Sequence, residues 1–278
     1  MSRSTAEIAR ITLQGNRPEN QDRFLVLQQD DCCMLVLGDG LGGHPRGDLA
    51  AQMLIDACEE MWATTRKPLL NPNYFIQQCA LRAHQAIVDW GIRQNPPVTP
   101  RTTAVIAILQ EGECYWGHAG DSRFYLIRDG RIHAKSTDHI VANEPERVIS
   151  SQLDSANPGA ITRCLGGASQ NAAPTLGSPI PLQEDDIVLL CSDGFWNQLG
   201  EELMLTTLHN AMPLDNALRM LGEMAEQNGI GQSDNITAVG VRTKHDSYGI
   251  GQIPITLEEE SELLLAIEHL NKLINRNF

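Results

Sequence analysis

The stretch that most constrains this chain is CCMLVLGDGLGGHPRGD, at residues 32–48. Met34 to Leu37 is a short run of apolar residues, which predicts a buried strand. The run ends at Gly38-Asp39-Gly40, where two glycines let the backbone turn sharply, and we expect a helix to begin near residues 45–48. This pattern puts Asp39 at the carboxyl end of a central strand, with its carboxylate in a crevice. Asp39 is therefore the first candidate metal ligand.

The same stretch contains Gly38-x-Gly40-x-x-Gly43, which matches the fingerprint of dinucleotide-binding proteins. That fingerprint requires a βαβ unit whose backbone amides face a pyrophosphate, whereas the residues that follow, up to Ile92, are predicted to be helical. An ionised Asp39 would also repel a phosphate unless a cation lay between them. The match is weak evidence on its own, and we do not expect nucleotide binding.

Five aspartates lie at the ends of predicted strands or in turns that contain glycine. One such aspartate means little, because Asp favours turns in any case, but five indicate convergence on one site. Carboxylates brought together without compensation would repel one another and take up protons. The expected compensation is hard divalent cations with oxygen ligands, Mg²⁺ or Mn²⁺. These aspartates are Asp22, Asp39, Asp121, Asp193 and Asp234.

The remaining pattern favours an α+β fold, because a helical hairpin is followed by a run of antiparallel strands without strand–helix alternation. Residues 132–167 have poor periodicity, so we expect a surface excursion and a flap over the site. A helix with an apolar stripe is expected at 257–274, after a linker that begins at Lys244. Other helices are expected at 47–65, 74–92, 200–210 and 214–228, and strands at 6–14, 23–27, 34–37, 102–109, 114–118, 122–128, 187–191 and 236–241.

The composition excludes several classes of protein. The chain has 278 residues and a net charge of −14, which disfavours non-specific binding to nucleic acid or to an anionic membrane. It has no apolar run of about 18 residues, so no membrane span is expected, and its first residues lack the apolar region of a signal peptide. Its seven cysteines are odd in number and form no CxxC pair. Reduced thiols and a cytoplasmic location are the expectation.

Eight short motifs follow one another along the chain: RPENQD (17–22), DGLGG (39–43), RTTA (101–104), GDSR (120–123), TDH (137–139), TRCLGG (162–167), SDG (192–194) and SDN (233–235). This ordered set resembles the metal-dependent protein serine/threonine phosphatases of the type 2C (PPM) family, in their bacterial form. The resemblance spans residues 8–243 and implies the family fold, a four-layer αββα sandwich of two antiparallel β-sheets flanked by helix pairs. It implies a catalytic domain over 1–243, followed by a linker and an amphipathic helix over 244–278.

The resemblance implies a role for each residue that matches a family motif. Asp39 would bridge two Mn²⁺ or Mg²⁺ ions, and the carbonyl of Gly40 would bind the second ion. Asp193 and Asp234 would hold the first ion. Asp22 would act mainly through coordinated water.

The resemblance also implies a third ion, held by Asp121 and Asp193, and a phosphate-binding residue, Arg17. In the implied reaction, a water that bridges two ions loses a proton and attacks phosphorus in line, while Arg17 and the ions offset charge on the phosphoryl oxygens. Asp39 and Arg17 would then carry catalysis. The expected partners are a phosphorylated Ser/Thr protein as substrate and a Ser/Thr kinase.

Two positions depart from the family pattern. Some members have Glu immediately before the aspartate of the first motif, whereas this chain has Gln21, which removes one charge from the side of the second ion. Some members carry His directly after the Asp-Gly pair, as a proposed general acid. Leu41 stands at that position, and we do not transfer the role to His44, so the general acid is unassigned.

Two other functions compete with the phosphatase. A catalytically weak signalling module that binds phosphoproteins on the same fold is suggested by Gln21, although the intact Asp193 and Asp234 argue against it. A metal-dependent nuclease would share the carboxylates but conflicts with the net charge of −14. The helix at 257–274 is expected to pack on the body, with docking or self-association as the alternative.

Overall fold

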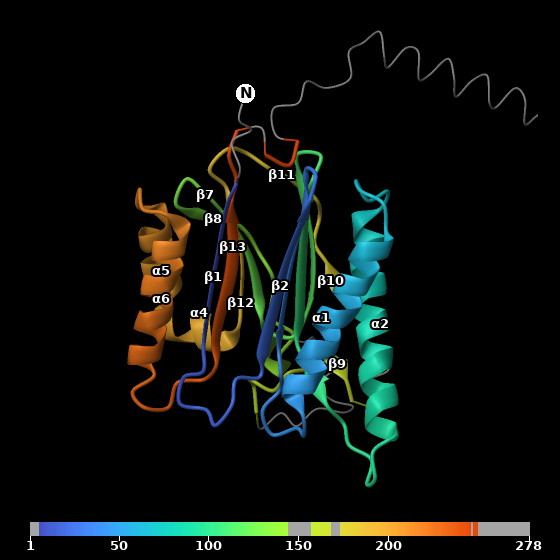
Figure 1. Cartoon of the computed structure of the whole chain (residues 1–278). Helices are drawn as coiled ribbons and strands as arrows, with labels where there is room; N and C mark the ends of the chain where they lie inside the picture. The colour runs from blue at the N-terminus through green and yellow to red at the C-terminus, as the bar shows by residue number, and fades with distance from the viewer. Residues whose placement is uncertain (1–5, 144–156, 168–172, 246, 250–278) are drawn as a thin grey trace, which may run out of the picture.

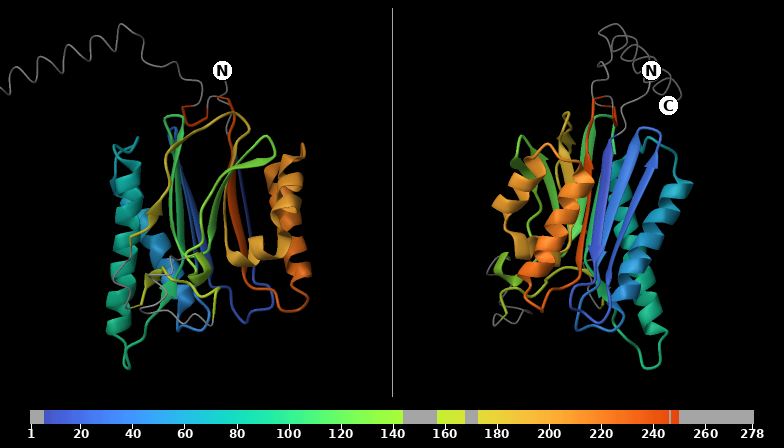
Figure 2. Two further views of the ribbon diagram at one scale, coloured as in Figure 1. Left: turned by 180° about the vertical axis from the view of Figure 1, so that it is seen from behind. Right: turned by 60° about the vertical axis from the view of Figure 1, so that its left-hand side comes forward.

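A computed structural model describes residues 6–143, 157–167, 173–245 and 247–249. Two antiparallel sheets are stacked face to face, and helices cover both outer faces (Figures 1 and 2). The predicted α+β sandwich is therefore confirmed. The helix expected at 257–274 lies outside the described residues, as does the segment 144–156 of the expected flap.

The first sheet has five strands, and every neighbouring pair in it is antiparallel. Its hydrogen-bonded order is β1 (Glu7–Leu13), β13 (Ile236–Arg242), β12 (Ile187–Cys191), β7 (Arg123–Arg128) and β8 (Arg131–Lys135). The strand β8 was not predicted, because its five residues contain only two apolar side chains, Ile132 and Ala134. The expected surface excursion therefore begins only after this strand.

The second sheet is also antiparallel and carries the central strand that ends at Asp39. Its order is β10 (Thr175–Leu176), β6 (Glu113–Ala119), β5 (Ala104–Gln110), β3 (Cys32–Asp39) and β2 (Asp22–Gln29), and β11 (Ile180–Pro181) also pairs with β6. A separate two-stranded ladder joins β4 (Arg101–Thr102) to β9 (Leu165–Gly166). Residues 175–181 thus contribute two short strands to the edge of this sheet.

The helices form two groups, one on each outer face (Figure 2). The second sheet is covered by α1 (Gly47–Thr64) and α2 (Pro72–Ile92), and the first sheet by α4 (Asp193–Leu199), α5 (Glu201–His209) and α6 (Leu214–Asn228). The short helix α4 was not predicted, because seven residues are too few to show helical periodicity. A single-turn 3₁₀ helix spans Val141–Asn143.

The central strands are apolar throughout because both of their faces are covered. In β3, Cys33, Leu35 and Leu37 pack between the two sheets, while Met34 and Val36 pack under α1 and α2. Successive side chains of a strand point to opposite faces, so a strand in the middle of four layers needs apolar residues at every position. This explains why the run CCMLVL shows no alternation.

The turn Ala119–Gly120–Asp121 carries the chain from one sheet to the other. The preceding strand, β6, belongs to the second sheet and the following strand, β7, to the first. The predicted run of antiparallel strands is therefore divided between the two layers. The crossing brings Asp121 into the gap between the sheets, near the ends of β3 and β12.

The glycines that flank Asp39 are required by close packing, and our expectation of a glycine-driven sharp turn was wrong. Neither residue has a positive φ, and β3 continues through Gly38 to Asp39. A Cβ on Gly38 would lie 2.9 Å from a methyl carbon of Leu54, and one on Gly40 would lie 2.4 Å from the carbonyl carbon of Gly47. These contacts let the start of α1 fold back directly onto the end of β3.

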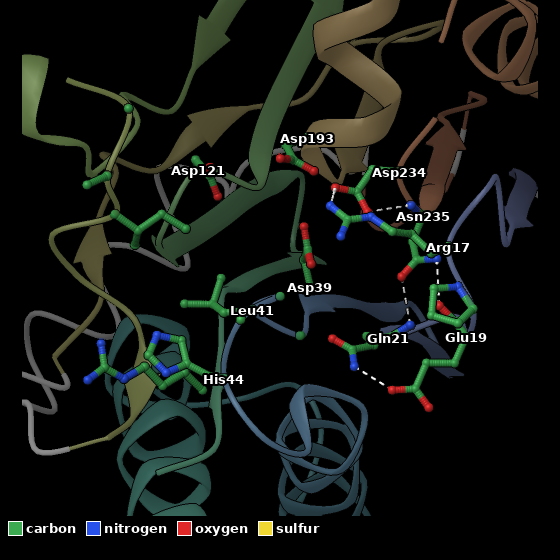
Figure 3. Close-up of a pocket in the computed structure, with 18 of the residues that line it drawn as sticks. Arg17, Glu19, Gln21, Asp39, Leu41, His44, Asp121, Asp193, Asp234 and Asn235 are labelled. Atoms are coloured by element: carbon green, nitrogen blue, oxygen red, sulfur yellow. Dashed lines mark hydrogen bonds and ion pairs between the residues drawn. The ribbon is translucent and has the colours of Figure 1, made fainter. Parts of the chain in front are cut away.

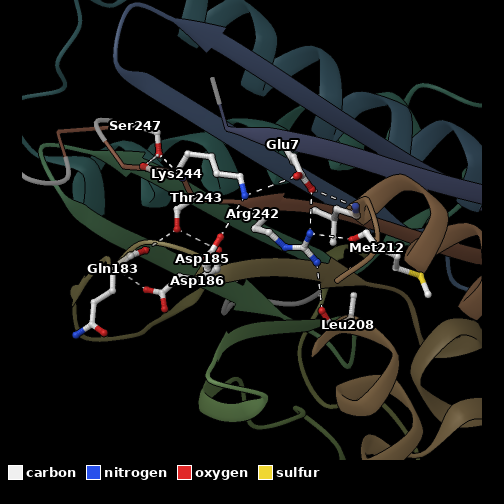
Figure 4. Close-up of polar contacts among 11 residues, drawn as sticks. Glu7, Gln183, Asp185, Asp186, Leu208, Met212, Arg242, Thr243, Lys244 and Ser247 are labelled. Atoms are coloured by element: carbon white, nitrogen blue, oxygen red, sulfur yellow. Dashed lines mark hydrogen bonds and ion pairs between the residues drawn. The ribbon is translucent and has the colours of Figure 1, made fainter. Parts of the chain in front are cut away.

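A network of polar contacts closes the end of the sandwich remote from Asp39 (Figure 4). Arg242, at the end of β13, donates to Glu7 at 3.0 Å and to the carbonyls of Leu208 and Met212. The chain stays packed beyond this strand, because Tyr248 is only 2% exposed and lies in the core between the sheets. In the described residues, no helix is both long and apolar enough to cross a bilayer.

Candidate metal centre and phosphate site

A cavity of about 860 Å³ opens where the two sheets diverge, at the ends of β3 and β12. Asp39 lies in its middle, Asp121, Asp193 and Asp234 lie on one side, and Leu41 and His44 lie on another (Figure 3). Four of the five predicted aspartates therefore line one cavity, together with Arg17 and Gly40. This convergence agrees with the inference from strand ends.

The fifth aspartate, Asp22, lies behind Asp39 and does not line the cavity. The two residues are direct partners in the antiparallel pair of β2 and β3. Asp22 is 4% exposed, and its Oδ2 accepts a hydrogen bond from the Ser192 hydroxyl at 2.9 Å. Its Oδ1 is buried and has no partner among the described residues. An acceptor without a donor is costly in a protein interior, so this oxygen is available to an ordered water or an ion.

The motif RTTA holds the backbone of Asp39 on both sides. The Asp39 amide donates to the hydroxyl of Thr103 at 2.9 Å, and its carbonyl accepts from the Thr103 amide at 2.8 Å and from the Thr102 hydroxyl at 3.0 Å. The Thr103 hydroxyl also lies 2.7 Å from that of Ser122, which follows Asp121. The two threonines therefore fix the position of Asp39 and connect it to the turn that carries Asp121.

Asp193 occupies the first turn of α4, directly after β12. Acidic residues are favoured in the first turn of a helix by its dipole. The pKa of Asp193 is nevertheless raised, first by burial and then by the charge of Asp234, although a hydrogen bond with Asp39 opposes the shift. Gly194 follows, and a Cβ there would lie 2.1 Å from the carbonyl oxygen of Asn235. The glycine of SDG thus brings α4 against the loop that carries Asp234.

Asp121 is held by residues of the motifs GDSR and TDH. The indole of Trp196 donates to the Asp121 carbonyl at 3.0 Å, and the Arg123 guanidinium lies 3.3 Å over the Trp196 ring. Arg123 also forms a two-pronged pair with Asp138, at 2.8 and 2.7 Å. Burial and the charge of Asp193 raise the pKa of Asp121 to about 7. The two motifs therefore support this carboxylate from behind.

Arg17 is the cation that contacts the acidic group directly. Its Nη2 lies 2.5 Å from Oδ2 of Asp234, and the hydrogen bond and charge of Asp234 raise the pKa of Arg17. Arg17 is half-exposed, so its guanidinium stands at the mouth of the cavity. It also lies near the loop after Asp39, because a Cβ on Gly42 would be 3.6 Å from its Nη1.

Asn235 ties the RPENQD loop to the SDN loop, and we did not predict this role. Its side-chain oxygen accepts from the Gln21 amide at 2.9 Å, and its Nδ2 donates to the carbonyls of Gln14 at 2.8 Å and Glu19 at 3.0 Å. Asn235 is 6% exposed. The motif SDN was visible in the sequence, but only the fold reveals that its last residue orients the loop of Arg17.

The two departures from the family pattern have clear structural settings. The Gln21 side chain lines the cavity, and its Nε2 donates to a carboxylate oxygen of Glu19 at 2.6 Å. Glu19 also lines the cavity, so a negative charge remains close to this side. Leu41 points into the cavity beside Asp39, whereas His44 lies further along the wall (Figure 3). The structure therefore gives His44 no contact with the acidic cluster.

The residues of this site fit hard divalent cations. Burial raises the pKa of Asp39 well above its ordinary value, and the charges of Asp22 and Asp193 add to the shift. Burial also raises the pKa of Asp22 to about 7. Within the described ranges, no three His, Cys, Asp or Glu side chains are arranged to hold one ion by themselves. An all-oxygen site that leaves room for water suits Mg²⁺ and Mn²⁺, which commonly keep several water ligands.

Comparison with known proteins assigns the chain to a family. The sequence profile of the protein phosphatase 2C family matches residues 14–228, and the chain belongs to this family. A serine/threonine phosphatase of Listeria monocytogenes, stp, is 26% identical over 230 residues, which cover 80% of this chain and 90% of that protein. The protein phosphatase PhpP of Streptococcus pneumoniae is 27% identical over 239 residues, which cover 83% of this chain and 95% of that protein.

Solved structures give the same result for the fold. The serine/threonine phosphatase of S. agalactiae is 28% identical and superposes with a TM-score of 0.74, covering 86% of this chain and all of that chain. The catalytic domain of the protein phosphatase PstP, solved with two manganese ions, is 26% identical with a TM-score of 0.69, covering 86% of this chain and 98% of that chain. The predicted family is confirmed.

Proposed function

We propose that the chain is a metal-dependent protein phosphatase that hydrolyses phosphoserine and phosphothreonine in protein substrates. The observation that carries the proposal is the convergence of Asp39, Asp193, Asp234 and Asp121 on one cavity that also contains Arg17. Family membership and the names of the relatives support the substrate class. No cysteine lines the cavity in the described residues, which favours direct attack by water over a thiol nucleophile.

The roles of the site residues follow from their positions. Asp39, held by Thr102 and Thr103, would be shared by two Mn²⁺ or Mg²⁺ ions, and the Gly40 carbonyl would face the second ion. Asp193 and Asp234 would hold the first ion. When bound, the ions supply an activated water and offset charge on the phosphoryl group.

The protein itself would contribute binding and orientation. Arg17 would bind the phosphoryl oxygens of the substrate, once a cation at Asp234 competes for that carboxylate and loosens their ion pair. Asn235 would keep Arg17 aimed at the cavity by fixing its loop. Asp22, buried behind Asp39, would hold an ordered water through its free oxygen.

We further propose a third ion between Asp121 and Asp193. The raised pKa of Asp121, at about 7, is caused by burial and by the neighbouring charge of Asp193. A cation between these two carboxylates would remove that repulsion. Titration of metal-free protein with Mn²⁺ would then give a weaker binding step that is lost in Asp121→Asn.

The test of the function uses metal-stripped protein and a phosphothreonine peptide. We expect phosphate release only when Mn²⁺ or Mg²⁺ is added, without inhibition by a thiol-alkylating reagent. Asp39→Asn should lower the rate by more than about 100-fold, because even residues that support a metal ligand are worth about 10–100-fold. Asp215→Asn, on the exposed surface of α6, is the matched control.

Two results would contradict the proposal. Full activity of Asp39→Asn would show that Asp39 is not a required metal ligand. No release by folded wild-type protein with any metal would favour the phosphoprotein-binding module. The circular dichroism spectrum of each variant should match the wild type, which separates a lost ligand from a lost fold.

The remaining assignments concern the setting of the enzyme. We propose that the catalytic domain comprises residues 1–243, that a Ser/Thr kinase makes the substrate, and that the enzyme acts in the cytoplasm, which the seven buried thiols support. The apolar stripe Leu263, Ile267, Leu270 and Ile274 supports a helix at 257–274 that packs on the body, with docking or self-association as the alternative. Under the alternative, removing 252–278 should change partner binding or oligomeric state. If both stay unchanged, the docking role is wrong.

A further inference from the structure

Arg101 is a cation of the cavity wall that the proposed reaction does not use. It lines the same cavity as Asp39, together with His44 and Ile161. Its Nε is buried without a hydrogen-bond acceptor in the described parts of the chain, and no carboxylate there forms an ion pair with it. A buried N–H donor normally finds an acceptor, because leaving it unpaired is costly. The half-buried guanidinium, with this Nε unpaired, therefore indicates a ligand that arrives from the cavity.

The backbone around Arg101 is held firmly in place. Its carbonyl accepts from the Leu41 amide at 3.0 Å, and Arg101 pairs with Gly166 in the short ladder of β4 and β9. Gly167 has a φ of +63°, and a Cβ at this residue would lie 2.6 Å from the Arg101 Nε. A glycine at this position is what lets the arginine side chain lie across the 165–167 segment. The arginine is thus built into the wall of the cavity.

His44 adds a second polar group on the same side. Burial lowers the pKa of His44, and the nearby Arg101 charge lowers it further. A neutral imidazole beside a guanidinium can donate a hydrogen bond to an anion without adding charge repulsion. The neighbouring Ala160 and Ile161 give this part of the wall an apolar surface. The combination suits a peptide side chain with an anionic end.

This group is separate from the position of the phosphate that is hydrolysed. In Figure 3, Leu41 and His44 lie on one side of Asp39 and Arg17 lies on the other. The cavity, at about 860 Å³, is far larger than a single phosphate requires and has room for several residues of a peptide. An anion at Arg101 would therefore belong to a neighbouring residue of the same substrate.

We propose that Arg101 and His44 form a second anion-binding subsite, which selects substrates with a carboxylate or a further phosphate close to the phosphoserine or phosphothreonine that is hydrolysed. The inference rests on the proposed function for its substrate class. It assigns Arg101 to substrate specificity, and it explains a cation in the wall of a strongly acidic protein. The planar guanidinium fork can bind carboxylate or phosphate through two parallel hydrogen bonds.

The first experiment measures peptide preference. A neutral phosphothreonine peptide is compared with peptides that carry one glutamate, or one phosphoserine, at each position from about three residues before to three after. In the presence of Mn²⁺, wild-type protein should prefer at least one anionic peptide by about tenfold in kcat/KM, since a charge-assisted hydrogen bond contributes about that much. The difference should lie in KM. The glutamate and phosphoserine series show which anion is bound.

The variants test whether Arg101 causes the preference. Arg101→Gln should reduce the ratio between anionic and neutral peptides towards one, and Arg101→Lys, which keeps the charge but loses the fork, should give an intermediate ratio. The matched control is Arg46→Gln. Arg46 lies at the end of the loop that carries His44, but its side chain is exposed and paired with Asp48. It should keep the wild-type ratio. If Arg101→Gln fails to fold, Arg101→Lys and His44→Gln carry the test.

A binding measurement separates this inference from the proposed function. Labelled peptides whose phosphothreonine is replaced by a phosphonate that cannot be hydrolysed are titrated against the protein and followed by fluorescence anisotropy. Tighter binding of the anionic peptide that depends on Arg101 supports the subsite even if no peptide is hydrolysed. Equal binding and equal kcat/KM for anionic and neutral peptides in wild-type protein would overturn it, as would an unchanged preference in Arg101→Gln.

Discussion

Asp22 on β2 and Asp39 on β3 are direct partners across an antiparallel strand pair, and Asp22 is almost fully buried. Like charges at directly opposed positions destabilise a sheet. Burial is the largest cause of the raised pKa of both carboxyl groups in metal-free protein; the charge of Asp22 adds to the shift of Asp39, and the charges of Asp193 and Asp234 add to that of Asp22. The same pair becomes favourable when cations are present. Stability and metal binding are therefore linked at this site.

The first prediction concerns the pH dependence of metal-free protein. The folded-state pKa of Asp22 is about 7, above its ordinary value of 3.8. A group with a raised pKa stabilises the fold at low pH, and its contribution is lost as pH rises from about 4 through about 7. Asp22 alone should lower the free energy of unfolding by at most about 1.4 kcal/mol per pH unit. Urea unfolding at pH 5, 6, 7 and 8 measures this slope, and Asp22→Asn should flatten it.

Binding of Mn²⁺ should release the protons that these carboxyl groups carry in metal-free protein. Asp22 and Asp121 both have a pKa of about 7, so Mn²⁺ must displace more protons at pH 6 than at pH 8. We expect tighter Mn²⁺ binding at pH 8. Calorimetry in two buffers with different ionisation enthalpies counts the protons released. An affinity that is constant over this range, with no proton release, would contradict the raised pKa values.

The second prediction concerns Gln21, which donates to Glu19 at 2.6 Å. Gln21→Glu replaces this hydrogen bond with two facing carboxylates, so the metal-free protein should become less stable. The added charge should tighten Mn²⁺ binding by up to about tenfold, which is the scale of groups that support a metal site. Thermal unfolding with and without Mn²⁺ measures both effects. Gln52→Glu, on the exposed surface of α1, is the control and should leave Mn²⁺ binding unchanged.

The third prediction concerns Asn235, whose side chain makes three hydrogen bonds to the loop from Gln14 to Gln21. Asn235→Ala leaves a buried amide and two carbonyls without partners, so the loss of stability should be about 2–4 kcal/mol. Arg17 should then be less well positioned, and KM for a phosphopeptide should rise. Urea unfolding and peptide kinetics measure the two effects.

Asn228 provides the control for this substitution. Its side chain makes one exposed hydrogen bond, to the Gln198 carbonyl at 2.8 Å. Asn228→Ala should change stability by less than about 1 kcal/mol and leave KM unchanged. If the two alanine variants behave alike, Asn235 does not have the positioning role that its contacts indicate.

The fourth prediction concerns the ion pair of Arg123 and Asp138, whose side chains are 15% and 9% exposed. Asp138→Asn leaves the guanidinium partly unpaired in a buried place, which should cost about 3–5 kcal/mol. Asp215→Asn breaks the exposed pair with Arg219, at 53% and 62% exposure, and should cost less than about 1 kcal/mol. Chemical unfolding of the two variants compares a buried with an exposed pair. Equal losses would show that burial does not strengthen the first pair.

The sequence allowed good predictions wherever a local pattern carries the information. The strand before Asp39, the strand before Asp193 and the two long helices α1 and α2 are visible as apolar runs or as helical spacing. Aspartates next to such strands could be proposed as ligands because a strand end and its turn are neighbours along the chain. Elements without a strong pattern, such as β8 and the seven-residue helix α4, were missed.

The supporting residues could not be predicted in the same way. Thr103 holds Asp39 across 64 residues of chain, Ser192 reaches Asp22 across 170, and Asn235 meets Gln21 across 214. Nothing local to any of these residues indicates its partner. The absence of an acceptor for the Arg101 Nε in the described part of the chain likewise depends on what the fold places around it.

The sequence alone therefore determined the chemical identity of the site, an all-oxygen set of aspartates with one arginine, and the layers that carry it. The tertiary structure decided which aspartates share the cavity, which one lies behind it, and that the Arg101 Nε has no acceptor among the described residues. The physical reason is that periodicity and residue chemistry are properties of short segments. Distance, burial and hydrogen-bond partnership arise only when segments far apart in the chain pack together.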